Sequence, residues 1–315
     1  DCISDGKTAV IGAIMEHVEH AGIHSGDSAC IIPPVHLKAE TIEVIRRQSL
    51  SLALELKVVG LMNVQYAIKD DRVYVLEVNP RASRTVPYVS KAIGVPLAKL
   101  AALCMAGKTL DELGFTESVR IDHFAVKEAV LPFARFPGAD VVLTPEMRST
   151  GEVMGIDREP GMAYLKSQIA AGSPLPQSGG VFLSVCDREK AAIVPMVQEL
   201  VDMGYRIYAT RGTATLLRDK SIKVQALFRI SEGRPNPVDL MRDGEVKWVV
   251  NIPDAGHQTQ EDDKQMRTEA VIRGVSLTST VRGLRAALDG LKSYRRLQLV
   301  DVCTLQELHS RIRIK

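Results

Sequence analysis

Two short segments of the chain alternate between apolar and polar positions. In LMNVQYAI, residues 61–68, and RVYVLEVN, residues 72–79, most even-numbered side chains are apolar, and the odd-numbered ones include amides and a carboxylate. Such alternation is typical of half-buried strands. We therefore predict an antiparallel hairpin with KDDR, residues 69–72, as its turn.

The register of this hairpin follows from its two apolar faces. Residues directly opposite one another share a face, so the numbers of paired residues must sum to an even value. A sum of 142 places Gln65 opposite Glu77. One polar face then carries Gln65, Glu77 and Asn79, and Pro80 ends the strand because proline has no N–H to donate.

The rest of the first half mixes strand-like and helical patterns. We predict a strand within residues 8–16, a helix over residues 38–56, a helix that Pro96 opens, and a short helix that begins with a capping box of Thr109 and Glu112. This mixture is typical of an α+β domain.

The second half alternates regularly between short strands and helices. The expected strands are GVFLSV, YRIYAT, KVQALF, KWVVNI and VSL, and the expected helices lie near residues 187–203, 213–219, 237–243, 262–273 and 281–292. This order predicts a Rossmann-type α/β domain, in which helices cover both faces of a parallel sheet.

A stretch rich in proline, glycine and serine separates the two halves. SPLPQSGG, residues 173–180, has the composition of an interdomain linker. We therefore predict two domains, residues 1–172 and residues 181–315.

Composition narrows the class of protein. Of 315 residues, 45% are hydrophobic and 25% charged, as in globular proteins, and 40 basic and 38 acidic residues are spread along the chain without a basic block. Nucleic acid is therefore not an expected partner. The five cysteines lie far apart without a CxxC motif, which argues against a disulfide framework or a zinc site.

The apolar runs and the first residues of the chain indicate where in the cell the protein is expected. No run approaches the roughly 18 apolar residues of a membrane helix, and the first residues lack the pattern of a secretory signal. We predict a cytosolic protein without a membrane partner. Because the chain lacks an initiator Met and opens close to a strand-like run, we also expect it to be a piece of a longer protein.

The polar face of the hairpin is the strongest candidate site. Its amide and carboxylate oxygens are ligands that Mg²⁺ takes while it keeps water and phosphate oxygens in other positions. Arg81 and Arg84 follow at once, and guanidinium groups bind phosphate or carboxylate oxygens through paired hydrogen bonds. We predict a site for a nucleotide with Mg²⁺ or Mn²⁺. The alternative is an ordinary solvent-facing surface.

Three segments of the first half closely resemble the second synthetase unit of carbamoyl-phosphate synthetase large subunits. They are EHAGIHSGDSA at residues 19–29, EVNPRASRTVPYVSKAIGVPLAK at residues 77–99 and PEMRSTGEVMG at residues 145–155. The resemblance runs in register to about residue 170 and continues more weakly through the second half. It implies an ATP-grasp fold for the first half.

The resemblance also implies roles for the hairpin. Gln65, Glu77 and Asn79 match the family's magnesium ligands, and Gln65 and Glu77 also belong to its ATP site. Arg81 matches an arginine near the nucleotide phosphates, and Arg84 matches one that lines the carbamate and phosphate site. The implied reaction is phosphorylation of carbamate by ATP to give carbamoyl phosphate for pyrimidine and arginine synthesis. Such a transfer depends on positioning and charge neutralisation, so we expect Glu77 to act as a ligand and not as a base.

The loop at residues 19–29 contributes two further sets. The family's nucleotide-contacting run is matched by Gly22, Ile23, His24 and Ser25. Outside this motif, His24 would be interpreted as a surface histidine. The acids that hold the activator ornithine in enterobacterial members, and a lysine beside them, are matched by Glu19, Asp27, Glu128 and Lys127. The alternative is a solvated acidic rim, because ornithine activation is not shared by every member.

The second half is similar to the methylglyoxal-synthase-like domain that ends these subunits and binds UMP or IMP. In ATRGTATLLRD a strand end, a glycine and a helix N-terminus follow one another, which favours phosphate binding, although such turns are common in α/β domains. Thr210 and Thr213 match the phosphate-binding threonines, Arg229 stands where the family has a lysine, and Asn251 starts an effector loop.

This half also departs from the family. Ile252 and Pro253 replace two threonines of enterobacterial members, and residues 280–283 (TVRG) replace a Thr-Leu-Asn-Gly-Gly run. Residues 232–239 (EGRPNPVD) lack the Gly-Gly-Asp-Gln run of methylglyoxal synthase, which favours regulation over catalysis.

The leading hypothesis is the C-terminal part of such an enzyme, with a glutaminase small subunit as partner and an oligomeric assembly. Because an ATP-grasp unit needs an upstream half, we expect the 315-residue chain alone not to make carbamoyl phosphate, and steady ADP release with carbamate and ATP would contradict this. Two alternatives are an isolated nucleotide-effector module and another ATP-grasp ligase such as a biotin carboxylase.

Overall fold

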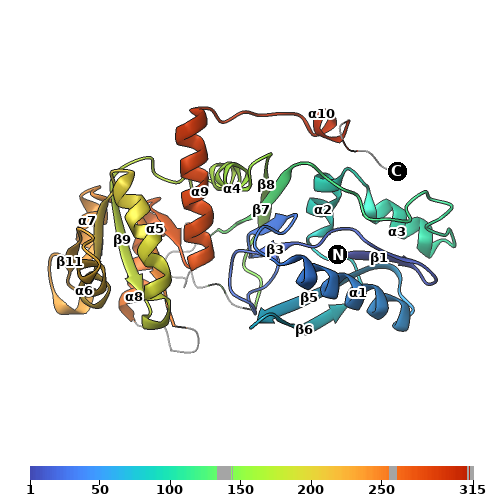
Figure 1. The fold of residues 1–315 in the computed structure, drawn as a ribbon, viewed down its shortest axis with the longest axis horizontal. Coiled ribbons are helices and arrows are strands. Elements are labelled where there is room, and N and C mark those ends of the chain that lie inside the picture. The colour runs from blue at the N-terminus through green and yellow to red at the C-terminus, as the bar shows by residue number, and fades with distance from the viewer. Residues whose placement is uncertain (133–142, 144, 255–260, 311, 313–315) are drawn as a thin grey trace.

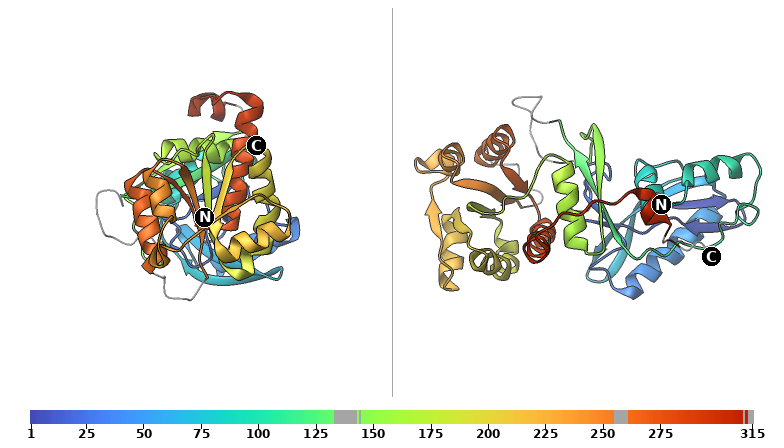
Figure 2. Two further views of the ribbon diagram at one scale, coloured as in Figure 1. Left: turned by 90° about the vertical axis from the view of Figure 1, so that its left-hand side faces the viewer. Right: turned by 90° about the horizontal axis from the view of Figure 1, so that it is seen from above.

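The computed structural model describes residues 1–132, 143, 145–254, 261–310 and 312. Figure 1 shows two lobes, one built from each half of the chain, with helices α4 (Pro160–Ala170) and α9 (Val281–Leu297) standing between them. The right-hand view of Figure 2 shows the same division from above.

A four-stranded antiparallel sheet of order β2-β1-β5-β6 contains the predicted hairpin. One face packs against α1 through Met62, Ala53 and Val58, and the other packs against α3 through Leu61. The helix expected over residues 38–56 and the hairpin are confirmed. The bounds are β1 (Cys2–Asp5), β2 (Ala9–Ile11), α1 (Ala39–Glu55), β5 (Val59–Lys69), β6 (Arg72–Asn79) and α3 (Leu97–Met105).

The predicted register holds at the end of the hairpin that carries Gln65 and Glu77, and it fails near the turn. Gln65 pairs with Glu77, as predicted, but Tyr66 pairs with Val75, so the sum changes from 142 to 141. Leu76 is the extra residue of this β-bulge, which an even-sum rule cannot foresee. The turn itself is a tight two-residue turn, because Asp70 and Asp71 both have positive φ.

A second antiparallel sheet, of order β3-β4-β7-β8, was not predicted. Its strands come from distant parts of the chain, so no local pattern pairs them. The Tyr88 hydroxyl of α2 donates to the carbonyls of Cys30 (2.9 Å) and Ala125 (2.7 Å) and thereby ties α2 to this sheet. The bounds are β3 (Glu16–His17), β4 (Cys30–Ile32), α2 (Val86–Ile93), β7 (Phe124–Val130) and β8 (Gly151–Asp157).

Smaller expectations were partly wrong. The strand expected within residues 8–16 is limited to β2, and β3 starts only at Glu16. The capping box of Thr109 and Glu112 forms, with N···O distances of 2.9 and 3.2 Å, but only a turn follows it.

No single helix of the described residues is long and apolar enough to cross a membrane. Helices α2 and α3 reach the necessary length and apolar character only as a pair, and that pair bends by 113°.

The second half forms the predicted parallel sheet, of order β11-β10-β9-β12-β13. Helices α5, α6 and α9 cover the face of Val181 and Leu183, and α7 and α8 cover the face of Phe182 and Val249. The bounds are β9 (Gly180–Val185), α5 (Lys190–Asp202), β10 (Arg206–Thr210), α6 (Arg211–Asp219), β11 (Gln225–Leu227), α7 (Pro237–Arg242), β12 (Val246–Ile252), α8 (Glu261–Ile272), β13 (Ser276–Thr278) and a C-terminal α10 (Leu305–His309).

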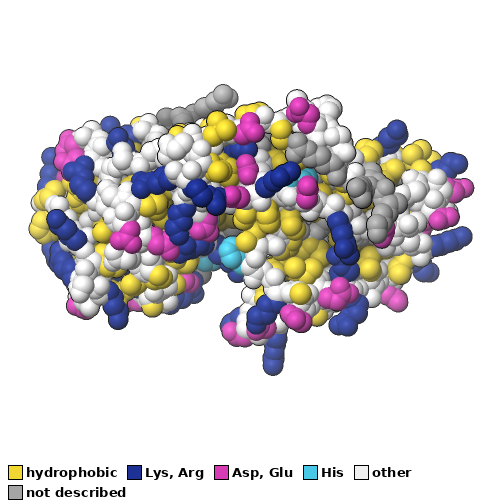
Figure 3. Space-filling model, turned by 45° about the horizontal axis from the view of Figure 1, so that its top comes forward, with side chains coloured by type: hydrophobic (Ala, Val, Ile, Leu, Met, Phe, Trp, Pro, Cys, Tyr) yellow, Lys and Arg dark blue, Asp and Glu magenta, His cyan; other side chains and the backbone are white. Residues whose placement is uncertain are grey.

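The two lobes share one hydrophobic core. Met162 of α4 and Val126 of β7 belong to the same buried cluster as Leu288 of α9. Where α4 crosses α9, the helices approach so closely that a Cβ on Gly161 would lie 2.5 Å from the carbonyl carbon of Asp289. Figure 3 shows a notch between the lobes, with histidine side chains at its edge.

Candidate nucleotide and effector sites

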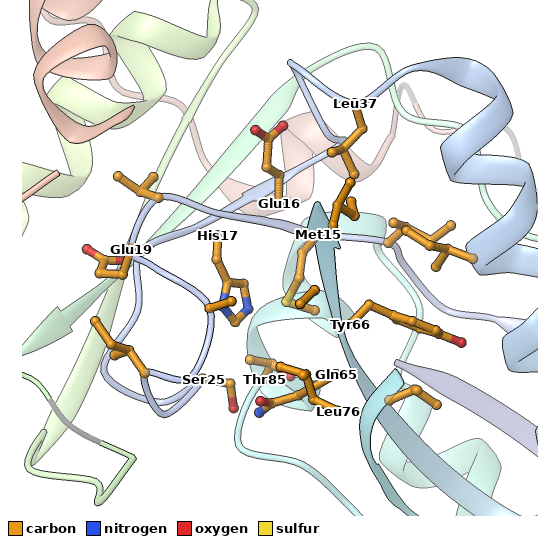
Figure 4. Close-up of a pocket in the computed structure, with 18 of the residues that line it drawn as sticks. Met15, Glu16, His17, Glu19, Ser25, Leu37, Gln65, Tyr66, Leu76 and Thr85 are labelled. Atoms are coloured by element: carbon orange, nitrogen blue, oxygen red, sulfur yellow. The ribbon is translucent and has the colours of Figure 1, made fainter. Parts of the chain in front are cut away.

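The first cavity lies where the lobes meet and has a volume of about 560 Å³. Its lining includes β3 with the loop that follows, strand β5 and the start of α9, together with residues of β1, β2, α1 and β6, Thr85 and Glu189. Figure 4 shows His17 and Glu19 of β3 and its loop, and Gln65 and Tyr66 of β5, among the side chains that line it. The cavity therefore joins the hairpin to the residue 19–29 motif.

The polar end of the hairpin brings the three predicted metal ligands together. Glu77 pairs with Gln65 across the strands, and the Asn79 amide donates to Glu77 Oε1 at 2.9 Å. One carboxylate and two amides suit an ion that also binds phosphate oxygens. Among the described residues, no group of three or more His, Cys, Asp or Glu side chains could hold a metal by itself.

The loop after the hairpin is held by the Asp1 carboxylate. Its oxygens accept hydrogen bonds from Asn63 of β5 (2.9 Å), Ser83 (2.6 Å) and Thr85 (2.5 Å). The loop is thereby fixed to the same sheet that carries Gln65, an arrangement that the sequence motifs did not indicate.

The two arginines of this loop stay exposed. Arg81 Nη1 donates to the Ala82 carbonyl at 3.0 Å, and the charge of Arg84 acts on the carboxyl of Glu152. Neither belongs to the described lining of the first cavity. Their proximity to a bound phosphate stays a prediction.

The run that is predicted to contact the nucleotide lies partly in the cavity wall. Gly22, Ile23 and Ser25 line the cavity, whereas the His24 ring turns into its own loop and accepts from the Gly26 N–H at 3.0 Å. Fully buried Lys127 donates to the carbonyls of Ser25 (3.1 Å) and Gly26 (3.0 Å). Lys127 therefore holds the loop in place.

The four predicted effector-site residues of this lobe divide into two groups. Asp27, like Lys127, has internal partners, since its carboxylate accepts from the N–H groups of Arg148 (2.7 Å) and Ser149 (2.9 Å). Glu19 accepts from the Ala29 N–H, and Glu128 accepts from the Gln168 amide. Asp27 thus joins two motifs that are 120 residues apart, and the other two acids remain candidates for a ligand.

Burial raises the pKa of both glutamates. For Glu19 the nearby charge of Glu128 adds to this rise, and for Glu128 the ammonium of Lys127 opposes it. Each carboxylate therefore costs energy to ionise until a cation approaches. A cationic ligand would relieve that cost.

His17 was missed by the sequence reasoning. It lines the first cavity, and burial lowers its pKa to about 4, with Lys127 and Arg282 adding to the effect and Glu19 opposing it. The imidazole is therefore neutral near pH 7 and available as a hydrogen-bond partner. Its two-residue strand carries too little pattern to predict.

The second cavity, of about 580 Å³, lies at the carboxyl ends of β9, β10 and β12. Thr210 and Gly212 line it at the start of α6, where free N–H groups favour an anion. Thr213 is buried beneath, and its hydroxyl accepts from Thr210 at 3.2 Å. The sequence prediction therefore locates this cavity, although Thr213 contacts it only through Thr210.

Further charged residues surround the second cavity. Arg229 and Asn251 line it as predicted, and Asn251 is fixed between Asp263 (3.1 Å) and Arg267 (2.6 Å). The charged lining residues that the sequence reasoning missed are Asp187, Arg188, Lys190, Arg211, Glu232, Asp254, Asp262 and Asp263. They are missed because they come from five separate segments.

Comparison with known families finds a match in each half of the chain. Residues 1–113 match the family described as carbamoyl-phosphate synthase L chain, ATP binding domain, and residues 192–279 match the MGS-like domain. These matches confirm the predicted fold of an ATP-binding α+β half and a methylglyoxal-synthase-like half.

Curated relatives agree along nearly the whole chain. Carbamoyl phosphate synthase large chains are 50% identical over 98% of this chain in Ralstonia nicotianae, 51% over 96% in Synechocystis sp. and 49% over 98% in Methanothermobacter thermautotrophicus. The chain spans 28–29% of the length of these relatives. Among solved structures, the biotin carboxylase domain of a single-chain bacterial carboxylase is 18% identical with a TM-score of 0.44, over 55% of this chain and 45% of that chain, which is too little to support an argument.

Proposed function

Because the chain is related over nearly its whole length to the C-terminal part of carbamoyl phosphate synthase large chains, we propose that it serves the same reaction as part of a longer protein. It binds Mg²⁺-ATP with the first half and takes part in the phosphorylation of carbamate to carbamoyl phosphate. A glutaminase small subunit is the proposed partner, and a nucleotide is the proposed effector of the second half.

The observation that carries this proposal is the hairpin end beside the first cavity. Gln65 and Glu77 are paired across the strands, and Asn79 contacts Glu77, so three oxygen-bearing groups lie together at the end of the hairpin. Of these three, Gln65 lines the first cavity, together with the predicted nucleotide-contacting residues Gly22, Ile23 and Ser25. A bound Mg²⁺ would neutralise charge on the transferred phosphoryl group. Gln65, Glu77 and Asn79 would hold the metal, and neutral His17, which lines the same cavity as Gln65, would offer a hydrogen-bond partner without a positive charge.

Manganese provides a direct test through its paramagnetic signal. We expect Mn²⁺ in the presence of ATP to bind the 315-residue chain, and Glu77→Gln to weaken binding about tenfold or more because it removes the only carboxylate of the set. Glu55→Gln, at the exposed end of α1, is the matched control and should leave binding unchanged. Binding that survives Glu77→Gln would contradict the proposal.

A second proposed activity is nucleotide binding in the second cavity, carried by Thr210, Gly212 and Lys190 around the start of α6. Calorimetry with UMP and with IMP tests it. We expect Thr210→Val to abolish binding. The control is Thr215→Val, which should not affect binding, because the Thr215 hydroxyl donates to the exposed carbonyl of Arg211. No heat with either nucleotide would overturn the effector role.

A cationic activator is proposed for Glu19 and Glu128, whose raised pKa values favour a diamino acid such as ornithine. The sequence relationship favours this enzyme over another ATP-grasp ligase. The oligomeric assembly and the cytosolic location remain predictions from the sequence.

A further inference from the structure

A single turn touches both cavities. The short 3₁₀ helix η2 (Asp187–Glu189) follows β9 and precedes α5. Glu189 lines the first cavity, whereas Asp187 and Arg188 line the second, together with Lys190. Neighbouring residues of one turn therefore face two different sites.

The cations around this turn are paired with acids that an anion would displace. Lys190 Nζ lies 2.5 Å from Asp187. Arg188 Nε lies 3.3 Å from Glu189, and Arg188 Nη1 lies 3.6 Å from Asp254. The Arg188 side chain is 52% exposed, so it can leave Glu189 at small cost, since exposed ion pairs contribute about 0–1 kcal/mol.

On the side of the first cavity, the turn faces the nucleotide-contacting loop. His20 of that loop lies in the field of Glu189, Arg188 and Arg282, and it is followed by Gly22 and Ile23, which line the cavity. The start of α9 anchors the same segment, because Thr280 Oγ1 donates to the Val18 carbonyl at 3.1 Å and Arg282 Nη1 donates to the His17 carbonyl at 3.4 Å.

We propose that Arg188 and Glu189 are positioning residues that link anion binding in the second cavity to the loop of residues 19–23. A bound phosphate group draws Arg188 and Lys190 toward itself. Glu189 then loses its Arg188 partner, and its carboxylate acts on His20 instead. The inference rests on the proposed effector function, since it requires an anion in the second cavity.

Histidine NMR on the full 315-residue chain tests this link without any activity assay. The His20 signal is assigned with His20→Gln, and its pKa is measured with and without inorganic phosphate and then UMP. We expect either anion to raise the pKa of His20 by about 0.2–0.7, because an unpaired Glu189 stabilises the imidazolium.

Two variants separate the link from a general effect of binding. Arg188→Gln should raise the pKa of His20 without phosphate, and phosphate should then add little. Glu189→Gln should lower that pKa and reduce its response to the part that Arg188 contributes directly, while phosphate still binds. Glu43→Gln, which breaks an exposed pair with Arg46 at 3.6 Å, is the control and should respond like the unmodified chain.

The outcomes are distinguishable. Heat of phosphate or UMP binding without any change at His20 overturns the link alone. Absence of binding heat with both anions overturns the effector function and the link together. An unchanged His20 response in Glu189→Gln also contradicts the proposal.

Discussion

At the scale of single residues, Lys127 is the one whose loss should be felt most. It is fully buried, donates to the carbonyls of Ser25 and Gly26, and its charge lowers the pKa of Glu128. Lys127→Met should destabilise the fold by about 3 kcal/mol in urea unfolding. The reason is that the carbonyls of Ser25 and Gly26 and the carboxylate of Glu128 would lose their cationic partner. The exposed Lys99→Met is the control, and a difference between the two below about 0.5 kcal/mol would refute this role.

The raised pKa values of Glu19 and Glu128 make stability depend on pH. The pKa of Glu19 is raised to about 8 and that of Glu128 to about 7, so the folded chain binds more protons than the unfolded chain between about pH 4.5 and 8. Their contribution to stability is complete below pH 4.5 and is lost as the pH rises through the folded pKa values. Stability should therefore fall across this window.

Glu19→Gln isolates this effect, because its amide keeps an acceptor for the Ala29 N–H but cannot ionise. The Tm of the variant should equal that of the unmodified chain at pH 5 and exceed it by about 2–4 °C at pH 8.5, which corresponds to about 1 kcal/mol. Parallel curves of Tm against pH would rule out a raised pKa for Glu19.

The positions of individual site residues could be predicted from the sequence where those residues lie within one locally patterned element. Strand alternation alone placed Gln65 opposite Glu77, since the two residues lie at the same end of one hairpin. His17 and Asp1 escaped prediction because their partners lie across the cavity or about 60–80 residues away. Contacts of that kind are set by tertiary packing, which no local pattern encodes.

At the scale of elements, the crossing of α4 and α9 depends on two glycines. A Cβ on Gly161 would lie 2.5 Å from the Asp289 carbonyl carbon, and one on Gly290 would lie 2.7 Å from the Gly161 oxygen. Gly161→Ala should cost about 1–3 kcal/mol in urea unfolding, because backbone atoms cannot move aside as a side chain can. Gly151→Ala, whose Cβ would meet only Val130 at 3.9 Å, is the control. Equal stability of both variants would show that the helices can separate.

Whether an element could be predicted depended on how far along the chain its partners lie. In the second half every expected strand and helix forms, because each βα unit is contiguous and its apolar runs are buried locally. In the first half β4 pairs with β7, from Cys30–Ile32 to Phe124–Val130, so the second sheet could not be seen. The bulge at Leu76 is a similar case, since the backbone departs from ideal pairing while the apolar pattern continues.

At the scale of the whole molecule, the shared core should make the two lobes unfold together. Val126 and Met162 of the first half belong to one buried cluster with Leu284 and Trp248 of the second. Cooperative unfolding follows when the contact between lobes contributes as much as the lobes' own stability. The contact also includes the Glu159 carboxylate, which accepts from Ser293 of α9 at 2.7 Å.

Trp248 makes this prediction measurable, because it is the only tryptophan and is fully buried in the second half. Its fluorescence and the far-ultraviolet circular dichroism of the whole chain should melt at the same temperature in the unmodified protein. In Gly161→Ala the strained crossing weakens the contact, so the fluorescence midpoint should move apart from the circular dichroism midpoint. Two separate transitions in the unmodified chain would mean that the lobes are stable independently of the contact between them.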